Sequence, residues 1–480
     1  MQIYDTARRA VVPLEPRTPG EVSIYNCGPT VYDAAHVGHA RNAVVVDVLR
    51  RYLRYRGYKV HYVSNFTDVD DKIILRAAER DEDADALASR YVEGWRFDMA
   101  RLNVEEPDVA PKATLHVSEM IEMIERLVER EHAYAAGGDV YFAVDSFPAY
   151  GSLSNRKTDE MQAGARVTPG DHKRNPLDFA LWKAAKPGEP SWESPWGTGR
   201  PGWHIECSAM AEKYLGRGFD IHAGGVDLVF PHHENEKAQS EAATDDEVPF
   251  ARMWVHNGLL NNVDGTKMSK SGTMVTIGSL LDSEPAGAVR LVLLQTHYRR
   301  PSDFSLDLMR EGTVAWSRLA NVRRRLADAA AGAGPVGAPP LAKAAFIAAM
   351  DDDLNTAEAV AACFELVRTA NLALDHGAEP AKAADLLNEL DELTTVLGLT
   401  FTEREPDAEL LNSMADLLAD YGSAATMVDG LDQMVEEALE IRTAARVARD
   451  YATSDAVRDR LEALGIVVKD AATGSTWHRE

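Results

Sequence analysis

Short apolar runs and helical patterns alternate along the first half of the chain. Residues 21–27 and 58–65 are rich in β-branched and aromatic side chains, and residues 44–55 between them carry apolar side chains at helical spacing. A strand, a helix and a second strand in this order form a βαβ unit. The pattern therefore predicts a parallel sheet with helices on its faces.

A second strand and helix follow farther along the chain. Residues 218–222 predict a strand that leads into a glycine turn, and residues 231–241 predict a helix that begins at a proline. Together with the first βαβ unit, they predict an α/β domain with a doubly wound parallel sheet over residues 1–307.

The rest of the chain divides by its pattern. An insertion at about residues 81–183 separates the two halves of the sheet. Beyond residue 307 helical spacing dominates, interrupted by a connector rich in glycine, proline and alanine at 332–340. We expect a helical stem and helical bundle over residues 308–430. A small mixed module follows over residues 431–480, which end in a strand-like segment.

The composition is that of a folded protein in a reducing compartment. The chain has 480 residues, of which 45% are hydrophobic and 26% charged, unlike a disordered chain. No run approaches the roughly 18 apolar residues that a membrane span needs, and the N-terminus has no signal-peptide pattern. Three cysteines are too few for a disulfide framework. We therefore expect a cytoplasmic protein without a membrane partner.

The charge is distributed unevenly. The net charge of −25 argues against a polyanionic partner, but phosphate contacts depend on local charge. Residues 36–60 carry six basic side chains against one acid, whereas residues 401–440 carry one arginine against eleven acids. General acidity for solubility explains much of the total, but it does not explain the basic stretch.

The first candidate site lies between the first predicted strand and the first predicted helix. Cys27-Gly28-Pro29-Thr30 is followed there by His36-Val37-Gly38-His39. Two histidines that flank a glycine at a helix N-terminus offer N–H donors and the positive end of the helix dipole, which suit a phosphate. Taken alone, the histidine pair is better explained as an ordinary polar turn.

The second candidate segment is Lys267-Met268-Ser269-Lys270-Ser271, flanked by Gly265 and Gly272. A loop with two lysines and two hydroxyls suits a pyrophosphate leaving group, because it supplies positive charge as negative charge develops. A solvated basic turn is the alternative for this segment taken alone.

The two motifs together resemble the HIGH and KMSKS signatures of class I aminoacyl-tRNA synthetases, with Val37 in place of isoleucine. The resemblance implies a Rossmann-type catalytic domain that activates an amino acid with ATP. It implies that His36, Gly38 and His39 bind ATP, and that Lys267 and Lys270 hold its phosphates together with Mg²⁺.

A third candidate site consists of metal-ligating side chains from distant segments: Cys27, Cys207, His232 and Glu236. His232 and Glu236 are four residues apart on a predicted helix and share one face, whereas His233 and Glu234 point off that face. Thiolate, imidazole and carboxylate ligands suit tetrahedral zinc. Two buried cysteines and a surface helix are the alternative.

Residues 202–207 and 230–236, with the motifs above, resemble the cysteinyl-tRNA synthetases, and the resemblance runs nearly end to end. It implies one zinc ion at the floor of the amino-acid pocket, held by the four ligands just named. Zinc binds a thiol as thiolate, whereas the hydroxyl of serine is a harder and less acidic ligand. Pocket shape alone separates such analogues by only about 1–3 kcal/mol.

The resemblance also implies substrate contacts for Thr67, Trp203 and Asp227. Thr67 follows a predicted parallel strand, at the edge where open α/β sheets bind ligands. Trp203 is expected to wall the pocket, and Asp227 to hold either the α-amine or the ribose. Core packing for Trp203 and a turn role for Asp227 are the alternatives.

The C-terminal module resembles the anticodon-reading part of the same family. The matching positions are Arg446, Tyr451, Asp455 and Asp470. An arginine and an aromatic ring suit stacking on bases, and carboxylates accept hydrogen bonds from base amino groups. A solvated amphipathic helix explains the alternation of arginine and aspartate as well.

The resemblance therefore implies an enzyme that activates L-cysteine as an adenylate and transfers it to tRNA(Cys), and we expect a monomer. A cysteine ligase of the mycothiol type, which joins cysteine to an amino sugar, has similar catalytic motifs but lacks the module at residues 431–480. A non-catalytic, zinc-dependent tRNA-binding protein would have no need of the lysine motif.

Overall fold

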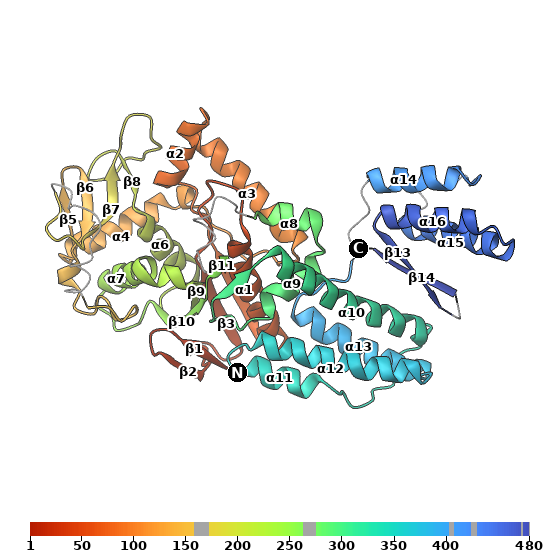
Figure 1. Ribbon diagram of the computed structural model, residues 1–480. Coiled ribbons are helices and arrows are strands. Elements are labelled where there is room, and N and C mark those ends of the chain that lie inside the picture. The colour runs from red at the N-terminus through yellow and green to blue at the C-terminus, as the bar shows by residue number, and fades with distance from the viewer. Residues whose placement is uncertain (158–171, 263–274, 403–407, 424–429, 472–473, 480) are drawn as a thin grey trace. The chain divides into compact units, whose positions relative to one another are not determined.

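The computed structural model describes residues 1–157, 172–262, 275–402, 408–423, 430–471 and 474–479 (Figure 1). The chain forms two compact units, residues 1–401 and 402–480, and each is described by itself. The boundaries predicted at residues 307 and 430 divide the chain differently and stay predictions of functional modules.

The centre of the first unit is a four-stranded parallel sheet in the order β10-β9-β3-β4. Its strands are β3 (Glu21–Asn26), β4 (Lys59–Ser64), β9 (Phe219–Gly225) and β10 (Ala251–Asn257). Helix α1 (Val37–Tyr55) connects β3 to β4 and packs on the sheet. The predicted α/β architecture with a parallel sheet is confirmed.

The predicted helix at residues 44–55 is longer than its apolar pattern indicates. It begins at Val37, because the His36 side chain caps it by accepting a hydrogen bond from the backbone N–H of Gly38. Because His36 is the N-cap, the other three residues of the motif, Val37, Gly38 and His39, form the first helical turn.

The chain between β4 and β9 adds helices and a four-stranded antiparallel sheet in the order β5-β6-β7-β8 (Figure 1). Its elements are α2 (Asp71–Glu79), α3 (Ala84–Arg101), α4 (Val117–Glu129), β5 (Ala133–Ala136), β6 (Asp139–Phe142), β7 (Phe179–Ala184), β8 (Gly199–Pro201) and α6 (Trp203–Leu215). Strand β8 extends this sheet beyond residue 183, where the sequence pattern places the end of the insertion.

The helix predicted at residues 231–241 differs from the structure. A π-helical turn at Val229–His233 precedes helix α7 (Glu234–Ala242), and Phe230 within that turn has an extended backbone. Pro231 therefore does not begin a regular α-helix, and the spacing of the side chains before Glu234 departs from 3.6 residues per turn.

The remainder of the first unit is largely helical. Its elements are the hairpin strands β1 (Gln2–Asp5) and β2 (Ala10–Pro13), the pair β11 (Leu260–Asn262) and β12 (Ser302–Phe304), and the helices α8 (Ile277–Ser283), α9 (Ala286–Leu294), α10 (Leu306–Ala330), α11 (Lys343–Asp351), α12 (Thr356–Asp375) and α13 (Pro380–Val396). Buried side chains of the sheet, such as Ile24, share one hydrophobic cluster with Leu291 of α9 and Leu366 of α12. Helices α10 to α13 thus pack on the same core as the parallel sheet.

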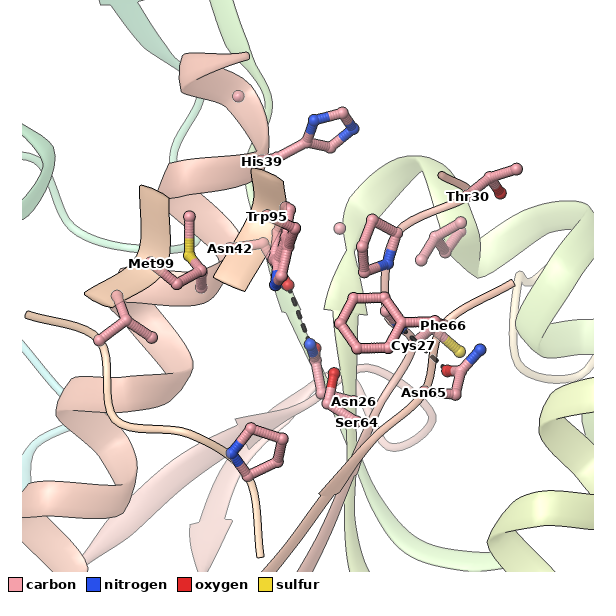
Figure 2. Close-up of a pocket in the computed structure, with 18 of the residues that line it drawn as sticks. Asn26, Cys27, Thr30, His39, Asn42, Ser64, Asn65, Phe66, Trp95 and Met99 are labelled. Atoms are coloured by element: carbon pink, nitrogen blue, oxygen red, sulfur yellow. Dashed lines mark hydrogen bonds between the residues drawn. The ribbon is translucent and has the colours of Figure 1, made fainter. Parts of the chain in front are cut away.

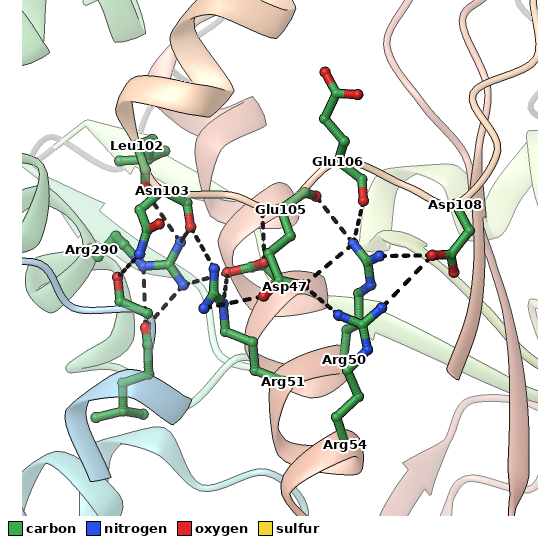
Figure 3. A network of polar contacts seen from close by, with 12 residues as sticks. Asp47, Arg50, Arg51, Arg54, Leu102, Asn103, Glu105, Glu106, Asp108 and Arg290 are labelled. Carbon is green, nitrogen blue, oxygen red and sulfur yellow. Dashed lines mark hydrogen bonds and ion pairs between the residues drawn. The ribbon is translucent and has the colours of Figure 1, made fainter. Parts of the chain in front are cut away.

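A buried ion pair ties several of these helices together (Figure 3). The guanidinium of Arg290, which is fully buried on α9, donates to Asp47 Oδ2 of α1 at 2.6 Å. It also donates to the backbone carbonyls of Leu102 and Asn103 at the end of α3, and to that of Leu397 at the end of α13. Arg290 therefore satisfies carbonyls at the ends of α3 and α13, which have no partner within their own helices, and the carboxylate of α1.

The basic stretch at residues 36–60 is occupied by contacts within the chain. Arg50, Arg51, Arg54 and Arg56 form ion pairs with carboxylates, and Arg41 donates to backbone carbonyls. The acidic partners Glu105 and Asp108 (Figure 3) and the partner Asp351 are distant in the sequence. The local charge excess therefore stabilises the fold and offers no free phosphate-binding patch here.

The second unit has a core of its own. It consists of α14 (Ala408–Ala419), α15 (Gly430–Val447), α16 (Tyr451–Ala463) and a hairpin of β13 (Ile466–Ala471) and β14 (Gly474–Arg479). Met434, Val457 and Leu461 are buried together in it. In neither unit does a described helix have the length and apolar character required to cross a membrane.

Replacement of Arg290 tests the buried ion pair. We expect Arg290→Met to lower the free energy of unfolding by about 3–5 kcal/mol, because it leaves Asp47 and several carbonyls buried without this donor. Urea unfolding followed by tryptophan fluorescence measures it, since seven of the eight tryptophans lie in the first unit. The control Arg368→Met removes an exposed pair with Glu365 and should change stability by less than about 0.5 kcal/mol. Equal effects of the two changes would contradict the role assigned to Arg290.

Candidate functional site

A cavity of about 470 Å³ opens at the carboxyl edge of the parallel sheet (Figure 2). The last residue of each of the four strands lines it: Asn26, Ser64, Gly225 and Asn257. Ligands of open α/β sheets bind at this edge, because the strand ends leave a crevice there. The cavity is therefore the candidate functional site.

A row of amide side chains crosses the floor of the cavity. Asn26 Nδ2 donates to Asn42 Oδ1 at 3.1 Å (Figure 2), and Asn42 Nδ2 donates to Asn257 Oδ1 at 2.8 Å. These bonds link β3, α1 and β10. The sequence analysis missed this row; the only signal is that Asn42 follows His39 by three residues, and so shares its helix face.

The histidine motif lies at the rim of the same cavity, at the start of α1. The rings of His36 and His39 stack with their centroids 3.8 Å apart, and His39 Nδ1 accepts a hydrogen bond from the backbone N–H of His36. A Cβ at Gly38 would lie 2.9 Å from the His36 ring, so this arrangement requires a glycine. The N-terminus of a long helix thus faces the cavity with its positive dipole end.

Lys267 and Lys270 lie outside the described residues, within 263–274. The chain that follows this segment is bonded to the start of α1. Val37 N–H donates to the carbonyl of Val275, and Ile277 N–H donates to the carbonyl of Ala35. The described chain therefore resumes, at Val275, beside the histidine motif.

The four predicted metal ligands come together in the fold, and we call them the Cys₂HisGlu cluster (Cys27, Cys207, His232 and Glu236). All four are buried, and their ligand atoms lie within 4.8 Å of one another. Cys27 Sγ is 3.6 Å from Cys207 Sγ and 3.3 Å from Glu236 Oε1, and His232 Nε2 is 3.0 Å from Glu236 Oε1.

The donor set fits a zinc ion. Bond lengths of about 2.3 Å to sulfur and 2.0 Å to nitrogen or oxygen imply tetrahedral separations of about 3.8 Å between sulfurs and 3.5 Å between sulfur and oxygen. The separations in the Cys₂HisGlu cluster are close to these values. Burial raises the pKa of the Cys27 and Cys207 thiols, so a bound cation is needed to hold them as thiolates.

A second set of possible ligands shares Cys27 and Glu236 but has His222 and His233 in place of Cys207 and His232. His222 Nε2 lies 2.9 Å from Glu236 Oε2, and His233 Nε2 lies 3.9 Å from Glu236 Oε1. The expectation that His233 points away from Glu236 was wrong, because the π-helical turn before α7 changes the spacing. Glu234 does point away, accepting from the backbone N–H groups of Gly151 and Ser154.

Two of the three predicted substrate contacts line the cavity, and the third does not. Trp203 lines the cavity and stacks on His232, with ring centroids 4.1 Å apart. Asp227 also lines it, in the turn after β9. Thr67 is buried, and its hydroxyl donates to Glu206 Oε2 at 3.0 Å. Thr67 is not one of the described residues that line the cavity.

The predicted anticodon contacts lie in the second unit. Arg446 is in the last turn of α15, and Tyr451 begins α16 with 62% of its side chain exposed. Asp455 is exposed and lies 3.6 Å from the guanidinium of Arg458. Asp470 is in β13, opposite Ser475, and its side chain lies outside the described part of the chain.

Comparison with protein families gives three matches along the chain. Residues 13–314 match the class I (C) catalytic domain of tRNA synthetases, residues 345–402 match the DALR domain, and residues 428–477 match the cysteinyl-tRNA ligase anticodon binding domain. The last range coincides closely with the C-terminal module that the sequence pattern predicts.

Two full-length relatives are cysteine–tRNA ligases. The one from Geobacter sulfurreducens is 47% identical over 488 residues, with 99% of each chain covered. The one from Anaeromyxobacter sp. strain K is 48% identical over 493 residues, with both chains covered completely.

Solved structures with the same fold are more distant in sequence. Methionyl-tRNA synthetase of Mycobacterium tuberculosis, bound by methionyl-adenylate, is 17% identical with a TM-score of 0.56, over 78% of this chain and 90% of its own. The LeuRS–tRNA–LeuAMS ternary complex of Agrobacterium radiobacter K84 is 11% identical with a TM-score of 0.60, over 80% and 85%.

A pair of glycine substitutions tests the link between the cavity wall and the cluster. Gly28 follows Cys27, and a Cβ there would lie 1.6 Å from the carbonyl oxygen of Asn65. We expect Gly28→Ala to displace Cys27 and to lower the metal content of the purified protein, as measured by elemental analysis.

The control is Gly94→Ala in α3, where a Cβ meets no atom within 4 Å. We expect it to keep the full metal content and to raise stability by about 0.5–1 kcal/mol, because alanine favours a helix interior. A full metal content in the Gly28→Ala protein would contradict the strict packing at Cys27.

Proposed function

The chain belongs to the cysteine–tRNA ligases, and from this membership we propose that its Cys₂HisGlu cluster holds one zinc ion that recognises the thiol of the substrate. The enzyme attaches L-cysteine to tRNA(Cys) with the consumption of ATP. The observation that carries the zinc proposal is the convergence of two thiols, an imidazole and a carboxylate at the separations of a tetrahedral site.

The four residues of the Cys₂HisGlu cluster would hold the zinc ion, which would supply a Lewis acid for the sulfur of cysteine. The protein's part is to hold the donors in place and to exclude water. Trp203, which stacks on the ligand His232 and lines the cavity, is proposed to wall the pocket beside the side chain of cysteine. Serine offers a hard, weakly acidic hydroxyl at the same place, so selection against it follows from the metal rather than from shape.

We propose that adenylate formation takes place at the N-terminus of α1. The carboxylate of cysteine attacks the α-phosphate of ATP in line, and pyrophosphate leaves. His36, Gly38 and His39 are proposed to bind ATP, since they line the cavity at the positive end of α1. Lys267 and Lys270 are proposed to hold the β- and γ-phosphates together with Mg²⁺.

Asp227 is the proposed acidic contact of the cavity, for either the α-amine or the ribose. Thr67 lies behind the wall, bonded to Glu206, and its predicted contact with substrate stays a prediction. The cluster and the cavity are both built from one chain, which supports a monomer as the working form. Three free cysteines support a location in the reducing cytoplasm.

We propose that residues 1–307 catalyse, that residues 308–430 form the stem and bundle, and that residues 431–480 read the anticodon through Arg446, Tyr451, Asp455 and Asp470. The match to an anticodon-binding domain at residues 428–477 supports this role. The same match disfavours the alternative of an amino-sugar ligase, since an enzyme that charges no tRNA has no use for that domain.

Substitution of Cys207 tests the zinc proposal. We expect Cys207→Ala to lose zinc and to lower cysteine-dependent exchange of pyrophosphate into ATP by at least about a hundredfold, because the cluster then lacks one thiolate. The remaining exchange should no longer discriminate cysteine from serine. The control Cys363→Ala removes a buried thiol of α12, far from the cluster in the sequence, and should keep both zinc and exchange. A zinc-free Cys207→Ala enzyme with an unchanged KM for cysteine would overturn the proposal.

Removal of the second unit tests the division of labour. The chain truncated after residue 401 keeps the first compact unit whole, including the cavity. We expect it to retain cysteine-dependent pyrophosphate exchange but to lose charging of tRNA(Cys), measured with radiolabelled cysteine. Charging at the rate of the full chain would show that residues 402–480 do not take part in tRNA recognition.

A further inference from the structure

The imidazole of His222 is enclosed by aromatic rings next to the Cys₂HisGlu cluster. His222 lies on β9 and is completely buried. Its ring stacks on Trp254 with centroids 4.7 Å apart, and it meets the rings of Tyr25 and Phe250 edge-on at 5.4 and 5.6 Å. These contacts fix the plane of the imidazole, which therefore has little freedom to choose its polar partner.

Among the residues that the structure describes, the polar partner of His222 is a ligand of the cluster. His222 Nε2 lies 2.9 Å from Glu236 Oε2, whereas His222 Nδ1 is buried and has no hydrogen-bond partner in the described part of the chain. A carboxylate oxygen accepts hydrogen bonds, so Nε2–H of His222 is the donor of this contact. The ring thus donates a single hydrogen bond, and it is directed at Glu236.

The two oxygens of Glu236 consequently have different surroundings. Oε1 faces the cluster, 3.3 Å from Cys27 Sγ and 3.0 Å from His232 Nε2. Oε2 is turned to His222. Since zinc binds carboxylates through one oxygen or both, the partner of Oε2 decides which of the two modes is available.

We propose that His222 is a positioning residue that keeps Glu236 a one-oxygen ligand and so leaves a place on the cluster for the sulfur of cysteine. This inference rests on the proposed function and deepens it. Zinc with three or four donors accepts one more, but a carboxylate bound through both oxygens would take that position itself. Residues around metal ligands commonly control affinity in this way, with effects of about tenfold to hundredfold.

A competing role for His222 is that of a direct ligand, in the set that it forms with Cys27, His233 and Glu236. Two observations favour positioning. His233 Nδ1 is 2.8 Å from His256 Nε2, and His233 Nε2 is as far as 3.9 Å from Glu236 Oε1. In contrast, His232 stacks on Trp203, which lines the cavity that the substrate must enter. The Cys₂HisGlu cluster is therefore the set of ligands that lies next to the cavity.

The test compares substitutions of His222 that differ in their hydrogen-bonding reach, made in the full-length holoenzyme. His222→Gln keeps an N–H donor near the position of Nε2, and His222→Met has a similar volume without a donor. His222→Asn keeps an amide donor that ends short of Glu236, so it serves as a second variant without a donor at the position of Nε2, should the Met protein fail to fold. The measurements are zinc content after dialysis against a chelator, the visible spectrum of the cobalt-substituted protein titrated with L-cysteine, and the KM values for cysteine and ATP.

We expect the Met and Asn variants to retain metal but to need about tenfold to hundredfold more L-cysteine for the spectral change, with an unchanged KM for ATP. The Gln variant should stay within about threefold of the wild type. The proposal is overturned if the Met and Asn variants titrate like the wild type, if Gln fails as badly as they do, or if all three lose their metal, which would make His222 a ligand. A wild-type cobalt protein that shows no response to cysteine would instead refute the zinc proposal.

Discussion

The burial of the Glu236 carboxylate is the constraint on which the site depends. Its side chain is completely inaccessible, and the ion-pair partners found for it among the described residues are histidines. Burial lowers the pKa of His232 and His233 well below the usual value, so these rings are neutral and do not balance the charge. An unpaired buried charge is costly, and a divalent cation with two thiolates is a compensation that the donors present can provide.

That requirement explains why distant segments must converge. Cys27 follows β3, Cys207 lies in α6, His232 lies in the π-helical turn and Glu236 lies in α7. The parallel pairing of β3 with β9 brings the first of these segments beside the chain that leads to the last two. The carboxyl edge of the sheet therefore borders both the Cys₂HisGlu cluster and the cavity, and Cys27 belongs to both.

The sequence is informative where physical rules are local. Strands β3 and β4 were predictable because they are rich in β-branched and aromatic residues, and β9 because it leads into a glycine turn. The four cluster residues were predictable from their chemistry, because thiols, an imidazole and a carboxylate together are a ligand set that suits zinc. The start of α7 was not predictable, since Pro231 is also a typical first residue of a helix, and only Phe230 in its extended conformation breaks the pattern.

Features that depend on partners distant in the sequence were missed. His222 lies in an apolar strand, and nothing in that pattern says that its ring meets Glu236 rather than solvent. The basic segment of α1 suggested a patch for phosphates, whereas Asp108, Glu105 and Asp351 pair with its arginines in the folded chain. The charge of a segment predicts a charged surface only when the fold brings no opposite charges next to it.

The arginines of α1 nevertheless have a role at the site, because they fix the helix that presents the histidine motif to the cavity. At its C-terminal end, α1 is tied through Arg56 to Asp351. Nearer its middle, it is tied through Asp47 to Arg290 (Figure 3). At its N-terminal part, Asn42 joins it to the sheet, and backbone bonds join it to the chain before α8. Groups that stabilise a transition state by charge are effective when they need no rearrangement. A helix that is held at both ends meets this condition, so the histidines at its N-terminus are in place before ATP arrives.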